Sequence, residues 1–188
     1  MSAGDGAAPV RAPPGLVAKP LPRTLLAKPL DYLHAEHRRL RLVCSLFQVA
    51  SEARQIARGH AQAASWVLAC ALPLHRADEE QDLFPALLRY AWGDDDLAGA
   101  IGELQVDHRR MNPLQTAIVD ALALSQDKGG HAVMALSWSV ARLLRTFADV
   151  ERRHVAVETG IVLAIARARI PRKGLAQIAA TMRARRTP

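Results

Sequence analysis

Two His-x-x-x-Glu pairs have the residue types and the spacing of a metal site. His75 is followed four residues later by Glu79, and His154 is followed four residues later by Glu158. Residues four apart on a helix lie one turn apart on one face, so each pair presents an imidazole and a carboxylate together. Leu72 shares the face of the first pair, which directs that carboxylate toward the protein interior. Burying a carboxylate costs several kcal/mol unless a positive charge or a metal ion accompanies it, so such a partner is expected.

Two further histidines, each preceded by an acid and followed by two arginines, complete an internal repeat. They are His37, within EHRR, and His108, within DHRR. The chain therefore alternates acid-His with His-x-x-x-Glu twice. Four imidazoles and two carboxylates suit two metal ions held side by side, each bound by two histidines, with Glu79 and Glu158 bridging the ions. This donor set favours iron, manganese or zinc over calcium or magnesium.

Helices must position these side chains, and apolar residues recur at helical spacing over four long segments. The predicted helices span 31–59, with Asp31 as N-cap, then 60–92, 96–126 and 131–168. Four long helices joined by short loops indicate an all-α protein with the architecture of an up-and-down four-helix bundle. The composition agrees, because Ala, Leu and Arg favour helix, whereas aromatic residues make up only 4% of the chain.

Prolines punctuate the predicted helices. Pro73 and Pro85 are expected to kink the second helix, and Pro113 is expected to bend the third. Pro171 is expected to start a short extra helix at the C-terminal end.

The heights of the candidate ligands can be compared by counting about 1.5 Å of rise per residue. His37 lies near the start of its helix, and His108 lies about a dozen residues into its own. His75 and His154 lie roughly 15 residues from the ends of theirs. In an up-and-down bundle these starts and ends share one end, so the candidate ligands are expected to converge at one level.

The flanking segments differ from the bundle in composition. Residues 1–28 are rich in Ala, Pro and Gly without periodicity, which predicts a disordered arm before a bundle at 29–168. Residues 169–188 are expected to form a basic C-terminal helix and tail. The net charge of +7 is concentrated there, because residues 167–188 hold seven Lys and Arg and no acid. No aromatic stacking residue accompanies them, which disfavours nucleic-acid binding.

The cysteine content and the apolar runs bear on the location of the protein. Only Cys44 and Cys70 are present, too few for a disulfide framework, and no apolar signal segment is recognisable. A reducing cytoplasm is the expected location, and both thiols are expected to be inert packing. No apolar run approaches the roughly 20 residues of a membrane span, so no membrane partner is expected.

The chain resembles the hemerythrin-like (HHE cation-binding) family, in its bacterial form, over about residues 29–168. The resemblance rests on His37, His108 and the two His-x-x-x-Glu pairs, and on the stretches DEEQDLFPALL and HVAVETGIVLAIARARI. It implies a non-haem di-iron site with an oxo or hydroxo bridge in a four-helix bundle. It also implies that dioxygen, nitric oxide or peroxide binds at an open iron position.

One departure from the oxygen carriers of that family bears on function. Those carriers have a second histidine one turn after the third-helix ligand, where this chain has Asn112. Both irons are then open, unless His34 or water supplies the fifth ligand. This difference disfavours reversible oxygen carriage and favours sensing or redox chemistry. His34 is also open to a capping or solvent-facing role.

Neighbouring residues offer alternatives to this ligand set. Glu80 competes with Glu79 as a bridge, but Glu79 is preferred because Glu80 corresponds to Thr159 in the repeat. Glu151-x-x-His154 fits a ferritin-like motif, but the chain lacks the second copy that such a site needs. Surface positions or roles around the ligands are expected for the other nearby acids, which are Glu36, Asp78, Asp82 and Asp107.

Three functions are compatible with these observations. The first is a di-iron protein that binds or senses a small diatomic or peroxide ligand, with Leu104, Phe147 and Ile161 restricting water around the metal. The second is an enzyme at the same centre, for peroxide breakdown, nitric oxide reduction or ferrous iron oxidation and storage. The third is a metal-free interaction bundle that acts through its basic tail. The sequence carries no indication of the oligomeric state.

Overall fold

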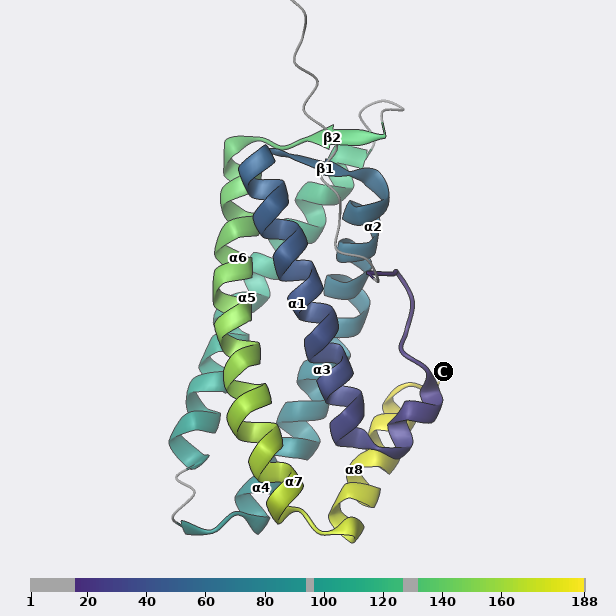
Figure 1. Ribbon diagram of the computed structural model, residues 1–188, viewed down its shortest axis with the longest axis vertical. Coiled ribbons are helices and arrows are strands. Elements are labelled where there is room, and N and C mark those ends of the chain that lie inside the picture. The colour runs from purple at the N-terminus through teal and green to yellow at the C-terminus, as the bar shows by residue number, and fades with distance from the viewer. Residues whose placement is uncertain (1–15, 94–96, 127–131, 188) are drawn as a thin grey trace, which may run out of the picture.

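Helices make up most of the described residues, which confirms the predicted all-α class. The computed structural model describes residues 16–93, 97–126 and 132–187. Its helices are α1 (Pro29–Ala53), α2 (Arg58–Trp66), α3 (Leu72–Asp78), α4 (Phe84–Tyr90), α5 (Leu97–Gln126), α6 (Trp138–Val157), α7 (Leu163–Arg169), α8 (Arg172–Arg185) and a 3-10 turn, η1 (Arg23–Ala27). The long helices α1, α5 and α6 lie along the long axis of the molecule, and α2, α3 and α4 follow one another along a parallel line (Figure 1).

The first long helix starts and ends earlier than predicted. Its N-cap is Lys28 and Pro29 is its first residue, so the prediction of Asp31 as N-cap is wrong. Proline suits this position because its fixed φ is helical and its missing N–H would have no partner in the first turn. The helix ends at Ala53, because Arg54 adopts a left-handed conformation with φ 49° and ψ 37°.

A two-stranded antiparallel sheet, absent from the sequence prediction, joins the ends of two helices. It pairs β1 (Gln55–Ala57) with β2 (Val133–Ala135), and Ile56 lies opposite Met134. The predicted helix over 131–168 therefore begins only at Trp138, where the hydroxyl of Ser137 accepts a hydrogen bond from the Val140 amide at 3.2 Å. Residue 131 lies outside the described residues.

The second predicted helix is one helical path with two π-helical turns, η2 (Val67–Ala71) and η3 (Glu79–Leu83). Pro73 and Pro85 follow these turns by two residues each. A proline ring crowds the carbonyl four residues earlier and cannot donate to it, and a wider turn removes that conflict. Pro113, in contrast, lies inside α5 without ending it. A third π-helical turn, η5 (Glu158–Val162), separates α6 from α7.

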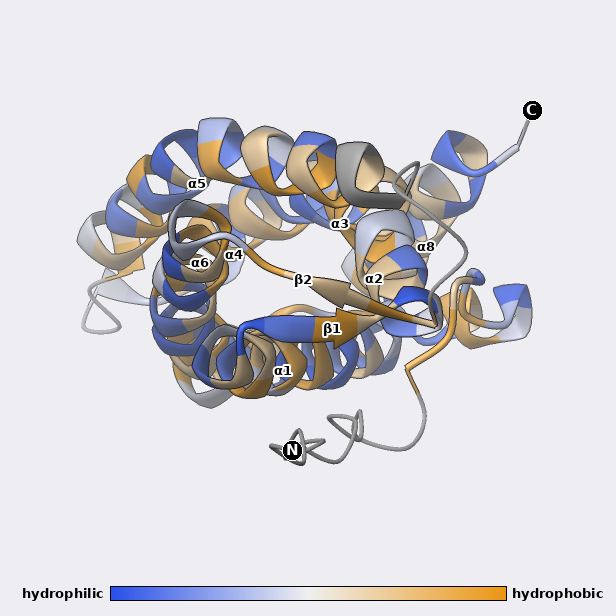
Figure 2. Ribbon diagram, turned by 90° about the horizontal axis from the view of Figure 1, so that it is seen from above, coloured by the Kyte–Doolittle hydropathy of each residue, from blue (hydrophilic) through white to orange (hydrophobic). Residues whose placement is uncertain are grey.

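The interior contains two apolar clusters with a polar layer between them. Viewed along the long axis, α1, α2, α5 and α6 surround a common interior (Figure 2). Phe47 and Phe147 meet edge to face in one cluster, with ring centroids 5.9 Å apart. Along α1, Leu33 belongs to the other cluster and Leu40 to the first, and the buried His37 lies between them.

Helix α8 packs back onto the bundle. Arg185 and Arg186 both donate to Asp78, whose side chain is fully buried, so of the two placements expected for Asp78, at the surface or around the ligands, the surface is excluded. Asp82 accepts from Arg185 at 2.9 Å. On the N-terminal side Leu26, in η1, is buried. The division into arm, bundle and tail stays a prediction, and residues 1–15 lie outside the described residues.

Two further expectations concern the burial of the cysteines and the presence of membrane-spanning helices. Cys44 is buried, but Cys70 is exposed, so the prediction that it packs on an apolar face is wrong. Cys70 lies in the π-helical turn η2, where Leu68 and Ala71 face the interior instead. Among the described residues, no helix is both long and apolar enough to cross a membrane.

Candidate metal centre

Six histidine and glutamate side chains meet in the polar layer between the two apolar clusters. Each is at most 4% exposed, so the group is almost completely shielded from water. They come from four stretches that are far apart in the sequence: His37 from α1, His75 and Glu79 from α3 and η3, His108 from α5, and His154 and Glu158 from α6 and η5. These are the six residues that the sequence singled out as ligands.

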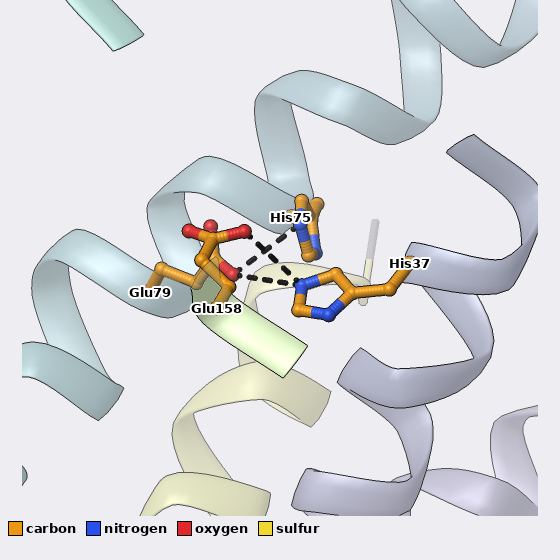
Figure 3. A group of neighbouring side chains, drawn as sticks. All are labelled: His37, His75, Glu79 and Glu158. Carbon is orange, nitrogen blue, oxygen red and sulfur yellow. Dashed lines mark hydrogen bonds and ion pairs between the residues drawn. The ribbon is translucent and has the colours of Figure 1, made fainter. Parts of the chain in front are cut away.

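The six residues fall into two groups that share one carboxylate. In the first group, donor atoms of His37, His75, Glu79 and Glu158 all lie within 4.8 Å of one another. Figure 3 shows how the two carboxylates face the two imidazoles of this group. In the second group, donor atoms of His108, His154 and Glu158 meet the same limit.

Each carboxylate directs its two oxygens at different histidines. Oε1 of Glu79 lies 3.3 Å from Nε2 of His37 and 3.3 Å from Nε2 of His75. Its Oε2 lies 3.7 Å from Nε2 of His108, in the other group.

Glu158 has the complementary arrangement. Its Oε2 lies 3.3 Å from Nε2 of His37, and its Oε1 lies 3.0 Å from Nε2 of His154. Both carboxylates therefore span the two histidine pairs, as a bridging carboxylate must.

The π-helical turns position both glutamates and change which of the following residues face the interior. Each of η3 and η5 begins at the glutamate of a His-x-x-x-Glu pair, so the internal repeat extends to the backbone. A π-helical turn holds one residue more than an α-helical turn, which shifts the phase of the residues within it and after it. Val162 is therefore buried, whereas Ile161 is 46% exposed, and the prediction that Ile161 shields the site is wrong. Leu104 and Phe147 are buried as predicted.

The histidines have opposite protonation preferences in the metal-free protein. Burial lowers the pKa of His37 and of His154, but close contacts with the glutamates and their charges outweigh burial and raise each pKa to about 9. Burial lowers the pKa of His75 well below its usual value, and it also lowers the pKa of His108. Two imidazoles thus hold protons at neutral pH and two do not.

The glutamates also differ. Burial and the charge of Glu158 raise the pKa of Glu79 to about 8. Burial acts in the same direction on Glu158, but its close contacts with the imidazolium ions of His154 and His37 hold its pKa well below the usual range. The cluster therefore stores protons on atoms that a metal ion needs free.

The donor atoms fit a metal better than they fit one another. Nε2 of His108 lies only 2.9 Å from Nε2 of His154. Two lone pairs would repel each other at this distance, so one of the two nitrogens must carry a proton unless a cation lies beside them. Oε2 of Glu79 and both carboxylate oxygens of Glu158 are buried without a hydrogen-bond partner among the described residues. Buried polar atoms of native proteins are rarely left unpaired. Cations beside these oxygens and nitrogens would satisfy them, so the residues fit two metal ions.

Neither additional candidate belongs to the donor cluster. His34 is half-buried on α1, where burial and Arg167 lower its pKa. Glu80 instead contacts the outer nitrogen of His108, with 2.7 Å between its Oε1 and Nδ1. The preference for Glu79 over Glu80 as the bridging residue agrees with this geometry.

A buried polar network next to the cluster was missed by the sequence reasoning. Nη1 of Arg76 donates to Oε1 of Gln115 at 2.9 Å and to the side chain of Asn112. Gln115 in turn donates to the carbonyl of Leu68 at 2.7 Å, and Nη2 of Arg76 lies 3.8 Å from Glu151. Glu151 thus pairs with an arginine instead of joining the cluster, which argues against the ferritin-like motif. The position of Arg76 beside His75, on an inward face, was the available clue.

A surface groove reaches one histidine of the second pair. It lies between α5 and α6, encloses about 430 Å³, and reaches His154. Its walls mix apolar and charged side chains, among them Leu104, Val150 and Asp107. Oδ2 of Asp107 lies 3.7 Å from Nδ1 of His154.

Comparison with models of known protein families gives a match. The family described as Hemerythrin, with the domain described as the hemerythrin HHE cation binding domain, matches residues 28–166. This range contains all six residues of the cluster and leaves out α8. None of the curated proteins compared with the chain is similar enough to count as a match.

Proposed function

We propose, from the premise that the chain belongs to the hemerythrin family of HHE cation-binding proteins, that it is a non-haem di-iron protein. In this proposal it binds or senses dioxygen, nitric oxide or a reactive oxygen species, and its helices form the up-and-down four-helix bundle of that family. Four histidines serve as terminal ligands and two glutamates as bridges, namely His37, His75, His108, His154, Glu79 and Glu158. A cytoplasmic location stays a prediction.

The observation that carries the proposal is the splitting of each carboxylate between the two histidine pairs. One oxygen of Glu79 faces His37 and His75, and the other faces His108. A single metal ion would need only one histidine pair and one carboxylate. Two carboxylates that each reach both pairs support two adjacent ions, whose repulsion the bridging negative charges offset.

The protein's own residues would bind, orient and shield the centre. Two iron ions, when bound, supply an open coordination position and the capacity to change oxidation state. Each pair of Nε2 atoms points at the cluster while the opposite ring nitrogen is available to outer partners such as Thr159 and Glu80. The apolar clusters on either side exclude bulk water from this layer. The groove at His154 provides a route for a small molecule.

The first test measures the metal content of protein purified without an affinity metal, together with its visible spectrum in the oxidised and reduced states. About two irons per chain are expected, with a charge-transfer band that disappears on reduction. The double substitution Glu79→Ala with Glu158→Ala removes both bridging carboxylates, and we expect it to bind at most one iron. Retention of two irons by the double variant would refute the assignment of the bridging residues.

Turnover separates the proposed binding or sensing role from an enzyme at the same centre. A sensor consumes nitric oxide or peroxide in stoichiometric amounts and stops, whereas an enzyme continues over many equivalents. A protein that takes up no iron after anaerobic loading would instead support an interaction role without metal.

A further inference from the structure

The centre has two metal positions, which are named here by their histidines. Position A lies at His37 and His75, and position B lies at His108 and His154. We propose that the two positions are inequivalent, and that position B holds its metal ion more tightly because carboxylates contact the outer nitrogens of its histidines. This inference rests on the proposed function.

The inequivalence begins with the residue that follows each bridging glutamate. Glu80 follows Glu79, and its Oε1 lies 2.7 Å from Nδ1 of His108, on another helix. Thr159 follows Glu158, and its Oγ1 lies 2.9 Å from Nδ1 of His37. The two halves of the repeat thus make the same crossed contact with different chemistry. A carboxylate accepts from position B, and a hydroxyl contacts position A.

The second histidine of each pair increases the difference. Nδ1 of His154, in position B, lies 3.7 Å from a carboxylate oxygen of Asp107. Neither this Nδ1 nor the buried Nδ1 of His75, in position A, has a hydrogen-bond partner among the described residues, so the difference between the two is the nearby charge of Asp107. Position B therefore has two acids around its imidazoles, and position A has none in contact with the outer nitrogens.

A positive charge lies beside the hydroxyl of position A. Nη1 of Arg41 donates to Oγ1 of Thr159 at 3.3 Å. This contact reduces the ability of the hydroxyl to accept a hydrogen bond from His37. The buried pair of Arg76 and Glu151 near the cluster carries opposite charges, so it does not cancel the contrast between the two positions.

The expected effect on metal affinity follows from the way that a residue in contact with the outer ring nitrogen acts on a metal-bound imidazole. A carboxylate that accepts the Nδ1–H bond makes the imidazole more basic and fixes its orientation, and loss of such a partner typically costs 10–100-fold in metal affinity. His108 is buried, which limits screening of its contact with Glu80. The Glu80 side chain is itself 40% exposed, which places the expected effect toward the lower end of that range. Glu80 and Thr159 are thus positioning residues that act through the histidines.

The test is a competition titration of the full, metal-free chain with zinc alone, which reports two stepwise binding constants. We expect two separate steps for the natural sequence. Glu80→Thr makes the two halves of the repeat alike, so the tighter step should weaken by roughly 10-fold and approach the weaker one. Thr159→Glu should tighten the weaker step. Glu80→Gln keeps an acceptor without the charge and should lie between Glu80→Thr and the natural sequence.

Matched substitutions and distinct outcomes keep this test separate from the test of the proposed function. Glu52→Thr removes the same charge at an exposed position near the far end of α1, and it should leave both constants unchanged. Two zinc ions bound with equal constants would refute the inequivalence while the metal centre stands. The same holds if Glu80→Thr leaves both binding constants within about twofold of those of the natural sequence. Binding of fewer than two zinc ions by the natural sequence would overturn the di-metal proposal itself.

Discussion

At the scale of single residues, the metal-free centre is a store of protons. His37 and His154 have pKa values raised to about 9, and the pKa of Glu79 is raised to about 8. At neutral pH these groups are protonated, because the glutamates stabilise the imidazolium ions and because burial disfavours a second carboxylate charge beside Glu158. A metal ion needs the neutral imidazoles and the ionised carboxylates. Metal binding must therefore release protons.

This competition predicts how metal affinity changes with pH. Below pH 8 the protonated forms of His37, His154 and Glu79 predominate, so from pH 6 to pH 8 the apparent zinc affinity should rise with pH, by up to about tenfold per pH unit for each proton released. The rise should level off near pH 9, where the groups lose their protons without metal. Competition titrations at several pH values give the slope. Calorimetry in buffers of different ionisation enthalpy gives the number of protons, which should exceed one per chain. An affinity that does not change with pH would contradict this protonation pattern.

At the scale of elements, three π-helical turns adapt the helices to prolines and to the site. The turns η3 and η5 each begin at a proposed bridging glutamate, and the residues after each turn are shifted in phase. A separate feature at this scale is the groove between α5 and α6, which reaches His154 of position B. Access to the centre is thus a property of how two helices pack rather than of one residue.

The groove predicts a substitution that slows entry without changing the ligands. Val150 is half-buried in the groove wall, one helical turn before His154, and is not one of the six residues of the cluster. Val150→Trp should fill part of the groove, so the association rate of azide or nitric oxide with iron-loaded protein should fall by roughly tenfold or more. The dissociation constant should change much less, because both rates pass through the same obstruction. Stopped-flow absorbance measures both quantities.

A tryptophan elsewhere on the surface controls for the size of the new side chain. Val49 is 43% exposed on α1, away from the groove, and Val49→Trp should leave the association rate unchanged. Equal rates in both variants and the natural sequence would show that small molecules reach the centre by another path.

At the scale of the whole molecule, α8 fastens the end of the chain to the helix that carries His75 and Glu79. Helix α8 lies beyond the range that matches the family. Even so, Arg185 and Arg186 surround Asp78, the residue before Glu79. Nε of Arg186 also donates to the Tyr32 hydroxyl at 3.2 Å, which ties α8 to α1. Two arginines of the basic tail are therefore engaged in the fold.

Removal of both arginines should destabilise the protein strongly. The double substitution Arg185→Met with Arg186→Met leaves the carboxylate of Asp78 buried without its charge partners, which typically costs about 3–5 kcal/mol of unfolding free energy. Urea unfolding measures the loss. Arg183→Met, at an exposed position of the same helix, should cost less than about 0.5 kcal/mol. Adding Asp78→Asn to the double variant should restore part of the stability, and no restoration would mean that the buried charge is not the cause.

The sequence by itself determined the helical class and the identity of the six clustered residues. Helical periodicity is a local property, and the repeat of acid-His with His-x-x-x-Glu encodes which side chains share a helix face. The family match is consistent with that interpretation. Those spacings survive small errors in helix boundaries, such as the start at Pro29 instead of Asp31, because His37 keeps its face.

Only the tertiary structure decided which partners surround these residues. The contacts of Glu80 with His108 and of Thr159 with His37 join different helices, so no spacing along one helix contains them. The burial of Asp78 depends on the return of α8, more than 100 residues later. The exposure of Ile161 depends on a π-helical turn, whose extra residue shifts a phase that α-helical counting assumes constant. Local patterns specify the faces of helices, but the packing of those faces is cooperative and sets the environment of every ligand.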